Sequence, residues 1–223
     1  MNPKIIKLND NAFIYFENVR KYYNKNLFES YYCSLPEYRK RIIDKLKTTK
    51  SKCLSLSAEN LLRYALKASG TDLISSEPIF NEYGKGSFPS VSDVFQYNLS
   101  HSGDYAVCAV NHGPEQIGCD VEKIRKVNFN VAKRFFTEKE YETVLSEASE
   151  EKRLETFFRF WTLKESYIKA LGTGLHKSLR SFEITVSKEG NIFLSGDENG
   201  NYVFGTATTD FGYVISWCLE IRQ

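Results

Sequence analysis

Apolar and polar positions alternate in a way that divides the chain into short strands and amphipathic helices. Strand patterns cover residues 12–16, 97–99, 105–110 and 116–121, and then 182–186, 192–194, 202–207 and 213–219. The turn residues Ser102-Gly103-Asp104 and Asn111-His112-Gly113-Pro114 separate strands in the first part of the chain. This order predicts an α+β protein of two halves, residues 1–112 and 113–223, each with a helix and a small antiparallel sheet.

Helical periodicity predicts the remaining elements. Residues 36–47 form a charged helix, and residues 57–67 form a stronger one, capped by Ser57 and ended by Gly70. Residues 131–136 are helical, and Thr137 and Glu140 fit a capping box that starts another helix. The strongest helical pattern covers residues 153–171, and Gly172 ends it.

Composition and charge are those of a soluble globular protein. Hydrophobic residues make up 42% and charged residues 26%, and a net charge of +2 is too small to indicate nucleic-acid binding. No two of the five cysteines are spaced as Cys-x-x-Cys, and their odd number argues against a closed disulfide framework, which favours reduced thiols and a cytoplasmic location. Because no membrane span or signal peptide is recognised, no membrane partner is expected.

A basic run between residues 36 and 52 includes Arg39 and Arg41. It fits either a solvated helix face or a surface that meets a phosphate-rich ligand. Asp120 and Glu122 form a second charged group, and strand geometry places both side chains on one face. Two carboxylates on one face repel each other unless a cation lies between them, and a hard divalent ion meets that need. The alternative is a strand end whose acids lie free in water.

Glu165 interrupts the apolar stripe of the strongest helix. A carboxylate on a buried stripe is costly unless it is paired or bound to a metal. Lys169 lies one turn further on, where it could form a simple Glu–Lys helix pair, and Lys164 lies at the edge of the same face. Both explanations, ion pair and metal ligand, stay open at this point.

These motifs together resemble the signature of the 4'-phosphopantetheinyl transferase superfamily. The pattern Gly-x-Asp-x-Glu at residues 118–122 is followed about forty residues later by Trp-x-x-Lys-Glu-x-x-x-Lys at residues 161–169. The turn around Ser100 and His101 and the segment 82–86 are also similar to family segments, although Gly86 stands where proline is usual. The resemblance covers roughly residues 36 to 186, and the chain length suits the Sfp (surfactin synthetase-activating) type.

The resemblance implies a fold of two similar halves related by pseudo-twofold symmetry, acting as a monomer. It implies a holo-[acyl-carrier-protein] synthase that transfers the 4'-phosphopantetheine arm of coenzyme A to a serine of an acyl or peptidyl carrier protein. Adenosine 3',5'-bisphosphate is released, and Mg²⁺ is required. The nucleophile belongs to the partner, which agrees with the absence of a recognisable catalytic triad in the sequence.

The resemblance also implies roles for individual residues. It implies metal ligation by Asp120, Glu122 and Glu165, and catalysis by Glu165 as general base and by Lys169, which neutralises the leaving nucleotide. Coenzyme A would be bound by residues from both halves: Arg39, Arg41, Lys85, Ser100, His101, Lys164 and Lys169. Leu54 and Ser55 stand where many relatives have arginine and threonine, and Leu54 cannot replace the arginine near the adenine.

Two further expectations complete the interpretation. Residues 126–147 are expected to contribute to the carrier-protein surface through Phe135 and Phe136, unless both rings pack in the core. Two other functions stay open: a different Mg²⁺-dependent enzyme that transfers phosphoryl groups from nucleotides, and a non-catalytic module that binds coenzyme A or a carrier protein.

Overall fold

The computed structural model describes residues 2–70, 76–197 and 200–221. It divides the chain into two compact units, Met1–Pro114 and Glu115–Gln223, whereas the sequence interpretation places the division after residue 112. Each unit is described by itself below. Both units combine helices with antiparallel strands, which confirms the α+β class.

The N-terminal unit has a four-stranded antiparallel sheet in the order β1-β2-β6-β5. The strands are β1 (Lys4–Lys7), β2 (Ala12–Asn18), β5 (Gln96–Ser102) and β6 (Tyr105–Asn111). Every residue of β6 is buried, as expected for a strand with a neighbour on each side. The other elements are η1 (Val19–Tyr23), α1 (Lys25–Cys33), α2 (Glu37–Asp44), α3 (Thr49–Ala68), β3 (Ile79–Phe80), β4 (Gly86–Ser87) and η2 (Pro89–Val91).

Helix α3 begins eight residues earlier than the sequence pattern predicts. Thr48 is its N-cap, and its side chain accepts a hydrogen bond from the backbone N–H of Ser51 at 3.0 Å. The prediction that Ser57 caps this helix is therefore wrong. Ser57 lies in the middle of α3, is fully buried, and donates a hydrogen bond to Glu17 of β2 at 2.6 Å. Glu17 lies on β2, forty residues earlier in the sequence, so the local pattern around Ser57 does not reveal this buried partner.

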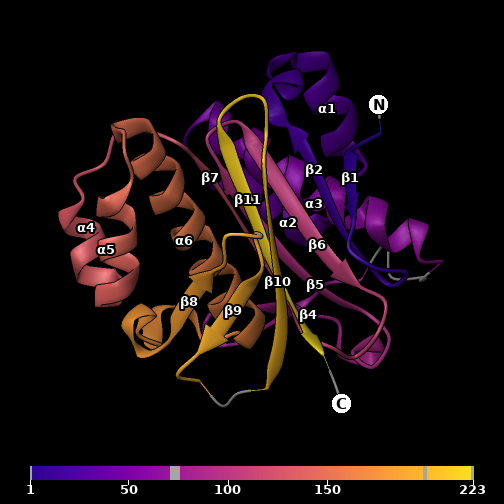
Figure 1. The fold of residues 1–223 in the computed structure, drawn as a ribbon. Coiled ribbons are helices and arrows are strands. Elements are labelled where there is room, and N and C mark those ends of the chain that lie inside the picture. Colours follow the sequence, from indigo (N-terminus) through magenta and orange to yellow (C-terminus); the bar gives the residue numbers. More distant parts are fainter. Residues whose placement is uncertain (1, 71–75, 198–199, 222–223) are drawn as a thin grey trace. The chain divides into compact units, whose positions relative to one another are not determined.

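The C-terminal unit has a three-stranded antiparallel sheet in the order β10-β11-β7. The strands are β7 (Ile117–Lys123), β10 (Asn201–Thr208) and β11 (Tyr213–Ile221). The long helix α6 (Glu150–Leu171) packs against this sheet and separates it from α4 (Asn130–Phe135) and α5 (Glu138–Ser146) (Figure 1). The remaining elements are η3 (Gly174–His176), η4 (Leu179–Ser181) and the hairpin of β8 (Glu183–Val186) and β9 (Ile192–Ser195).

Local signals predicted the start of α5 and the end of α6, whereas α6 begins at Glu150, three residues before the predicted start. Thr137 and Glu140 form the expected capping box at the start of α5. Gly172 is left-handed, with φ 68°, and its backbone N–H donates to Ile168 at the end of α6. The core around α6 is rich in aromatic rings, among them Phe157, Phe158 and Tyr167.

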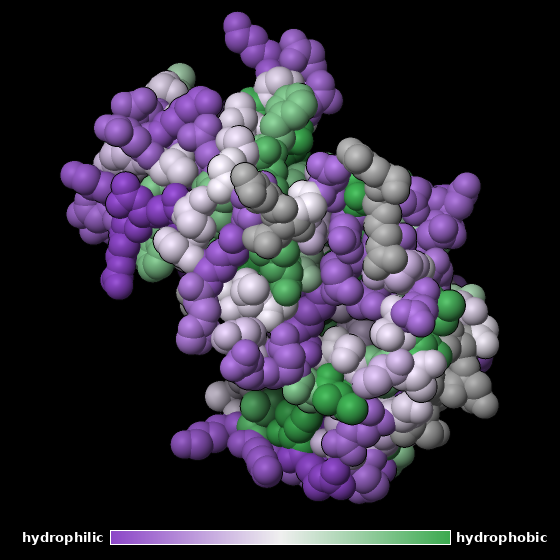
Figure 2. Space-filling view, turned by 90° about the horizontal axis from the view of Figure 1, so that it is seen from below, coloured by the Kyte–Doolittle hydropathy of each residue, from purple (hydrophilic) through white to green (hydrophobic). Residues whose placement is uncertain are grey.

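One face of the molecule is mainly polar. Hydrophilic residues cover most of the face seen in Figure 2, and hydrophobic residues emerge there in several smaller patches. Among the described helices, none has both the length and the apolar character needed to cross a bilayer. All five cysteines are free thiols, and four of them are buried, which leaves Cys33 exposed.

Candidate active site

Helix α6 and strand β7 approach each other closely at Gly118. A Cβ atom at Gly118 would lie 2.0 Å from the carbonyl oxygen of Ser166 and 2.5 Å from the backbone nitrogen of Ala170. Both are backbone atoms of α6, so a side chain at Gly118 would push the helix away from the strand. The glycine of the Gly-x-Asp-x-Glu motif thus sets the distance at which β7 presents its acids to α6.

Asp120 and Glu122 follow Gly118 on alternate positions of β7, so the three residues share the sheet face that meets α6. Asp120 is 5% exposed, and its Oδ1 accepts a hydrogen bond from Lys169 Nζ of α6 at 2.6 Å. Glu122 is half-buried, and its Oε2 lies 3.3 Å from an Arg125 guanidinium nitrogen. The two carboxylates therefore face α6, each with a cationic neighbour.

Glu165 completes the acidic group from the side of α6. Burial raises the pKa of Glu165 to about 7, and the negative charges of Asp120 and Glu122 add to the rise, while Lys169 opposes it. The structure thus brings Asp120, Glu122 and Glu165 within electrostatic reach of one another, although two of them lie on a strand and the third on a helix. Burial also disfavours the charge on Lys169, but Asp120 outweighs it and the pKa of Lys169 is raised.

The chemistry of these donors suits a hard cation. Three carboxylates supply only oxygen ligands, and mutual repulsion together with burial makes Glu165 difficult to ionise by itself. A divalent ion would remove that penalty. Within the described residues, however, no group of three or more His, Cys, Asp or Glu side chains stands in a metal-binding arrangement. Metal ligation by Asp120, Glu122 and Glu165 therefore stays a prediction that their chemistry supports.

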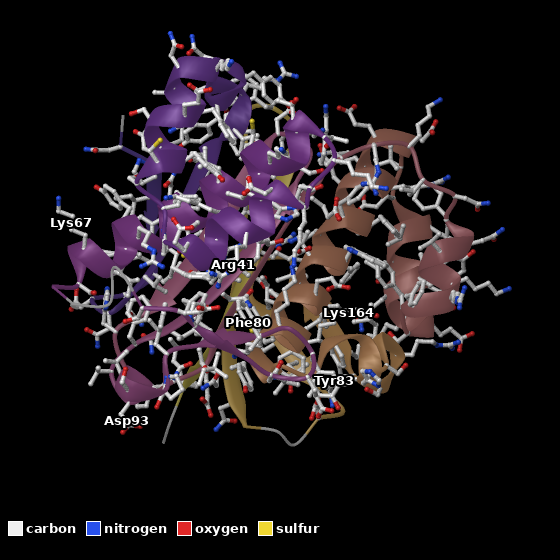
Figure 3. The ribbon with its side chains drawn as sticks, turned by 180° about the vertical axis from the view of Figure 1, so that it is seen from behind. Arg41, Lys67, Phe80, Tyr83, Asp93 and Lys164 are labelled. Carbon is white, nitrogen blue, oxygen red and sulfur yellow. The ribbon has the colours of Figure 1, made fainter. Side chains whose placement is uncertain are left out.

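Lys164 requires a correction. The sequence interpretation assigns it to the phosphates of coenzyme A, but its side chain is fully buried in the C-terminal unit (Figure 3). Its Nζ forms an ion pair with Glu140 Oε1 at 2.8 Å and donates to the carbonyl oxygens of Leu179 and Phe182, each at 2.7 Å. These three interactions use all three donors of the ammonium group. Lys164 therefore joins α6 to α5 and to the segment before β8, and has no donor left for a phosphate.

Sequence reasoning recognised Glu140 only as part of the capping box of α5 and missed its role as the buried partner of Lys164. Besides capping α5, its carboxylate accepts a hydrogen bond from the backbone N–H of Ile184 at 2.7 Å and neutralises Lys164. Burial lowers the pKa of Lys164, and Glu140 opposes that effect. The available signal was the position of Lys164 beside the apolar residues of α6, where a lysine needs a buried partner.

Arg39 and Arg41 occupy different environments although both lie on α2. Arg39 is mostly buried, and one of its guanidinium nitrogens lies 2.7 Å from Glu59 Oε2, which neutralises much of its charge. Glu59 is itself fully buried and also pairs with Arg63 at 2.7 Å. Arg41 is exposed (Figure 3), with a loose contact of 3.8 Å to Glu77. Arg41 is therefore the more accessible cation of the two, and the assignment of either to coenzyme A stays a prediction.

Ser100 and His101 lie near the end of β5, where Ser100 is buried and His101 is exposed. Lys85 is half-buried directly before β4. Its neighbour Gly86 packs so closely that a Cβ there would lie 2.2 Å from the Tyr97 hydroxyl of β5. This contact is a physical reason for glycine at position 86. Roles for Ser100, His101 and Lys85 in coenzyme A binding stay predictions.

Leu54 and Ser55 lie inside α3 and not before a helix, because α3 begins at Thr49. Leu54 is 8% exposed and belongs to the apolar core of the N-terminal unit. Its place in that core gives it a packing role. Leucine at position 54, where many relatives have arginine, is therefore buried in the core and does not expose an apolar side chain.

The segment 126–147 contributes both core and surface. Phe136 is in the core, as the alternative interpretation expected, while Phe135 is partly buried against Trp161 with ring centroids 5.6 Å apart. Lys133 and Arg134 are exposed on the same helix. Next to it, a cavity of about 170 Å³ is lined by apolar residues with two charged groups, namely Val127, Val131, Phe157, Phe158, Trp161, Glu122 and Arg125. An apolar depression therefore borders one of the site's acids.

Comparison with known proteins agrees with the motifs. Residues 116–218 match the model of the family described as the 4'-phosphopantetheinyl transferase superfamily. The chain is 35% identical over 138 residues to the 4'-phosphopantetheinyl transferase Sfp of Bacillus subtilis, covering 61% of this chain and 60% of that protein. It is 34% identical over 162 residues to the human L-aminoadipate-semialdehyde dehydrogenase-phosphopantetheinyl transferase, covering 65% of this chain and 50% of that protein. The matches thus span between half and about three fifths of these relatives.

Among solved structures, the holo-[acyl-carrier-protein] synthase of Thermotoga maritima is similar over 48% of this chain and 64% of its own, with 24% identity and a TM-score of 0.42. The family-model match, residues 116–218, lies within the unit that carries Gly118, Asp120, Glu122 and Glu165. The resemblance inferred from the motifs is therefore confirmed: residues 116–218 of this chain match the 4'-phosphopantetheinyl transferase superfamily.

Proposed function

We propose that this protein transfers the 4'-phosphopantetheine arm of coenzyme A to a serine of an acyl or peptidyl carrier protein, in a reaction that depends on Mg²⁺. The observation that carries the proposal is the close packing at Gly118, which brings Glu165 of α6 within electrostatic reach of Asp120 and Glu122 of β7. The family match over the same unit supports this choice of chemistry.

Asp120, Glu122 and Glu165 are the proposed ligands of the cation. When bound, Mg²⁺ would supply positive charge to the pyrophosphate of coenzyme A. Glu165 is also the proposed general base toward the carrier serine, because a pKa of about 7 lets a carboxylate accept a proton near neutral pH. Asp120 raises the pKa of Lys169 and so keeps it charged, and Lys169 is the proposed cation that stabilises the leaving adenosine 3',5'-bisphosphate.

Lys164 has no phosphate-binding role in this proposal. Its ion pair with Glu140 instead holds α6 against α5, and α6 carries Glu165 as the next residue. We propose that coenzyme A is contacted by four residues of the N-terminal unit, namely Arg41, Lys85, Ser100 and His101. Arg39 is proposed to have a lesser part in binding, because its guanidinium already pairs with Glu59.

The carrier protein is proposed to dock over the apolar cavity beside Glu122. The partly exposed Trp161 and the exposed Val131 supply apolar surface there, and Lys133 and Arg134 of neighbouring α4 supply positive charge. An acidic helical partner matches this combination, because aromatic contacts and charge complementarity together favour association. Action as a monomer and a cytoplasmic location are part of the same proposal.

The deciding experiment follows the mass of a purified apo carrier protein mixed with this protein, coenzyme A and Mg²⁺. We expect one serine to gain the mass of the phosphopantetheine arm, and chelation by EDTA to stop the reaction. Asp120→Asn and Glu165→Gln should abolish the modification while circular dichroism stays unchanged. Lys188→Gln, an exposed change elsewhere in the same unit, serves as the control.

The same assay separates the alternatives. Consumption of nucleotide without a carrier protein would favour another nucleotide phosphoryl-transfer enzyme. Binding of coenzyme A that Glu165→Gln leaves unchanged, with no turnover under any condition, would favour a non-catalytic binding module. A panel of acyl and peptidyl carrier proteins would then identify the natural substrate class.

A further inference from the structure

A second cavity lies between the N-terminal part of α6 and strands β10 and β11 of the C-terminal unit. Its volume is about 280 Å³, and polar side chains form most of its wall: Glu147, Lys152, Glu155, Thr156, Arg159, Thr206, Thr208 and Val214. It shares no lining residue with the group of Asp120, Glu122 and Glu165. The proposed transfer reaction therefore does not use this cavity.

Arg159 is the unusual member of this wall. Its side chain is half-buried, and its Nε is buried without a hydrogen-bond acceptor. Across residues 2–70, 76–197 and 200–221, no ion pair neutralises its guanidinium. Burial lowers the pKa of Arg159, and no carboxylate opposes that effect. A guanidinium held in this way is costly unless an anion enters the cavity.

The other charged groups of the wall already have partners. Glu147 Oε1 accepts a hydrogen bond from Thr156 Oγ1 at 2.8 Å. Lys152 Nζ lies 2.8 Å from Glu155 Oε2 in an exposed ion pair. Their positions at the wall nevertheless disfavour a highly charged ligand such as a polyphosphate, because two carboxylates would repel it. The cavity is therefore suited to an anion of low charge.

The opposite side of the cavity supplies hydroxyl groups. Thr206 and Thr208 alternate along β10, so both side chains lie on the face that holds Ser216 and Val214 of β11. Thr206 Oγ1 accepts from Ser216 Oγ at 3.1 Å, which leaves the Thr206 hydroxyl hydrogen to donate. A guanidinium and two hydroxyls thus border one cavity from opposite sides.

We propose that this cavity binds a compact oxyanion, either a carboxylate or a single phosphate group, with Arg159 as its main ligand. The planar guanidinium can donate two parallel hydrogen bonds to such an anion, and Thr206 and Thr208 can donate from the strand side. Arg159 lies six residues before Glu165, roughly 9 Å along the helix axis. The bound anion would therefore stabilise the part of α6 that precedes the site without entering it.

Isothermal titration of the metal-free protein in EDTA tests the proposal, with inorganic phosphate, sulfate and acetate as probes at constant ionic strength. We expect saturable binding at one site, and at least a tenfold weaker affinity in Arg159→Gln. Arg180→Gln, which removes an exposed arginine of the same unit, should leave the affinity unchanged. Tighter binding of phosphate and sulfate would identify a phosphate site, and tighter binding of acetate a carboxylate site.

NMR provides a readout that does not depend on the stability of a variant. The Arg159 Nε–H resonance of the wild-type protein should shift as the anion is added. Thr208→Val, a nearly isosteric change at an exposed position, should weaken binding by about threefold or more while the protein stays folded. Equal affinity in wild type and Arg159→Gln, or an unmoved Arg159 resonance, would overturn the proposal. Neither result depends on carrier-protein modification.

Discussion

Gly118 of β7 and Ser166 of α6 are so close that a single Cβ at residue 118 would come within 2.0 Å of the Ser166 carbonyl oxygen. This contact couples the acid pair of the strand to the acid of the helix, because Asp120 and Glu122 follow on the same face of β7 and Glu165 precedes Ser166. The position of Glu165 relative to the strand acids therefore depends on the absence of a side chain at residue 118.

Gly118→Ala is expected to lower both stability and activity. The added methyl group meets helix backbone, which cannot turn aside as a side chain could, so the cost should be about 1–3 kcal/mol in the free energy of unfolding. Activity should fall further than the loss of folded protein explains, because α6 moves with Glu165. Urea unfolding and carrier modification, measured on the same preparation, test this. Wild-type activity in the folded fraction would contradict it.

Lys164→Met is expected to destabilise the C-terminal unit strongly. It leaves Glu140 buried without its cation, which typically costs about 3–5 kcal/mol. Lys139→Met is the matched control, since it removes an exposed partner of Glu183 and should cost less than about 1 kcal/mol. The two midpoints of urea unfolding give the comparison. Near-equal midpoints would show that Lys164 is not a structural cation.

The double variant Lys164→Met, Glu140→Gln should regain part of that stability, because it removes both buried charges together. Where these variants fold, the KM for coenzyme A should stay close to that of the wild type. A selective rise in KM without destabilisation would instead return Lys164 to the phosphate-binding role that the sequence motif suggests.

Local sequence patterns correctly predicted those features that depend on residues close to one another in the chain. Thr137 and Glu140 lie three residues apart and form their capping box, and Gly172 ends α6 in the left-handed conformation. Spacing also placed Asp120 and Glu122 on one face of a strand. Glu165 was recognised as a candidate site residue because it interrupts the regular period of the apolar stripe on its helix.

Residues whose partners are distant in the sequence were harder to interpret. Ser57 resembles a helix cap, but its hydroxyl binds Glu17, forty residues away. Lys164 resembles a ligand of phosphate, but Glu140 and two carbonyl groups surround it. Arg39 likewise meets a fully buried Glu59. Each polar residue fits two environments, and only the tertiary structure selects between them.

Mg²⁺ is expected to stabilise the wild-type protein against heat, because repulsion among the three carboxylates raises the free energy of the metal-free state. Binding at a hundred times the dissociation constant adds about 2.7 kcal/mol. Asp120→Asn should remove most of the Mg²⁺-dependent rise in melting temperature. Differential scanning calorimetry with and without Mg²⁺ measures this, and an equal rise in Asp120→Asn would place the ion elsewhere.

His112 is expected to make the N-terminal unit sensitive to acid. Burial lowers its pKa below the ordinary 6.5, and its ring lies 5.8 Å from both Phe13 and Phe95. The unfolded chain therefore binds a proton first as the pH falls. The contribution of His112 to the free energy of unfolding should be fully present above about pH 6.5. It should decrease as the pH falls from there to the folded-state pKa of His112.

Hydrogen exchange of the β6 amides as a function of pH measures this local stability. His112→Phe should flatten the profile below pH 6.5, because it keeps an aromatic ring and removes the titrating group. His176→Phe, at an exposed position of the C-terminal unit, should leave the profile unchanged. An unaltered acid-dependent slope in His112→Phe would assign the effect to another group.

Thr48 and Ser57 offer a direct test of where α3 begins. Thr48→Ala removes the N-cap and should cost about 1 kcal/mol. Ser57→Ala leaves the buried Glu17 without one of its donors, so it should cost more, about 1–3 kcal/mol, although Ser57 lies where alanine is the better helix former. Urea unfolding followed by circular dichroism compares the two variants. If Ser57→Ala were neutral or stabilising, its hydrogen bond to Glu17 would have no energetic weight, and if Thr48→Ala were neutral, Thr48 would not be the residue that caps α3.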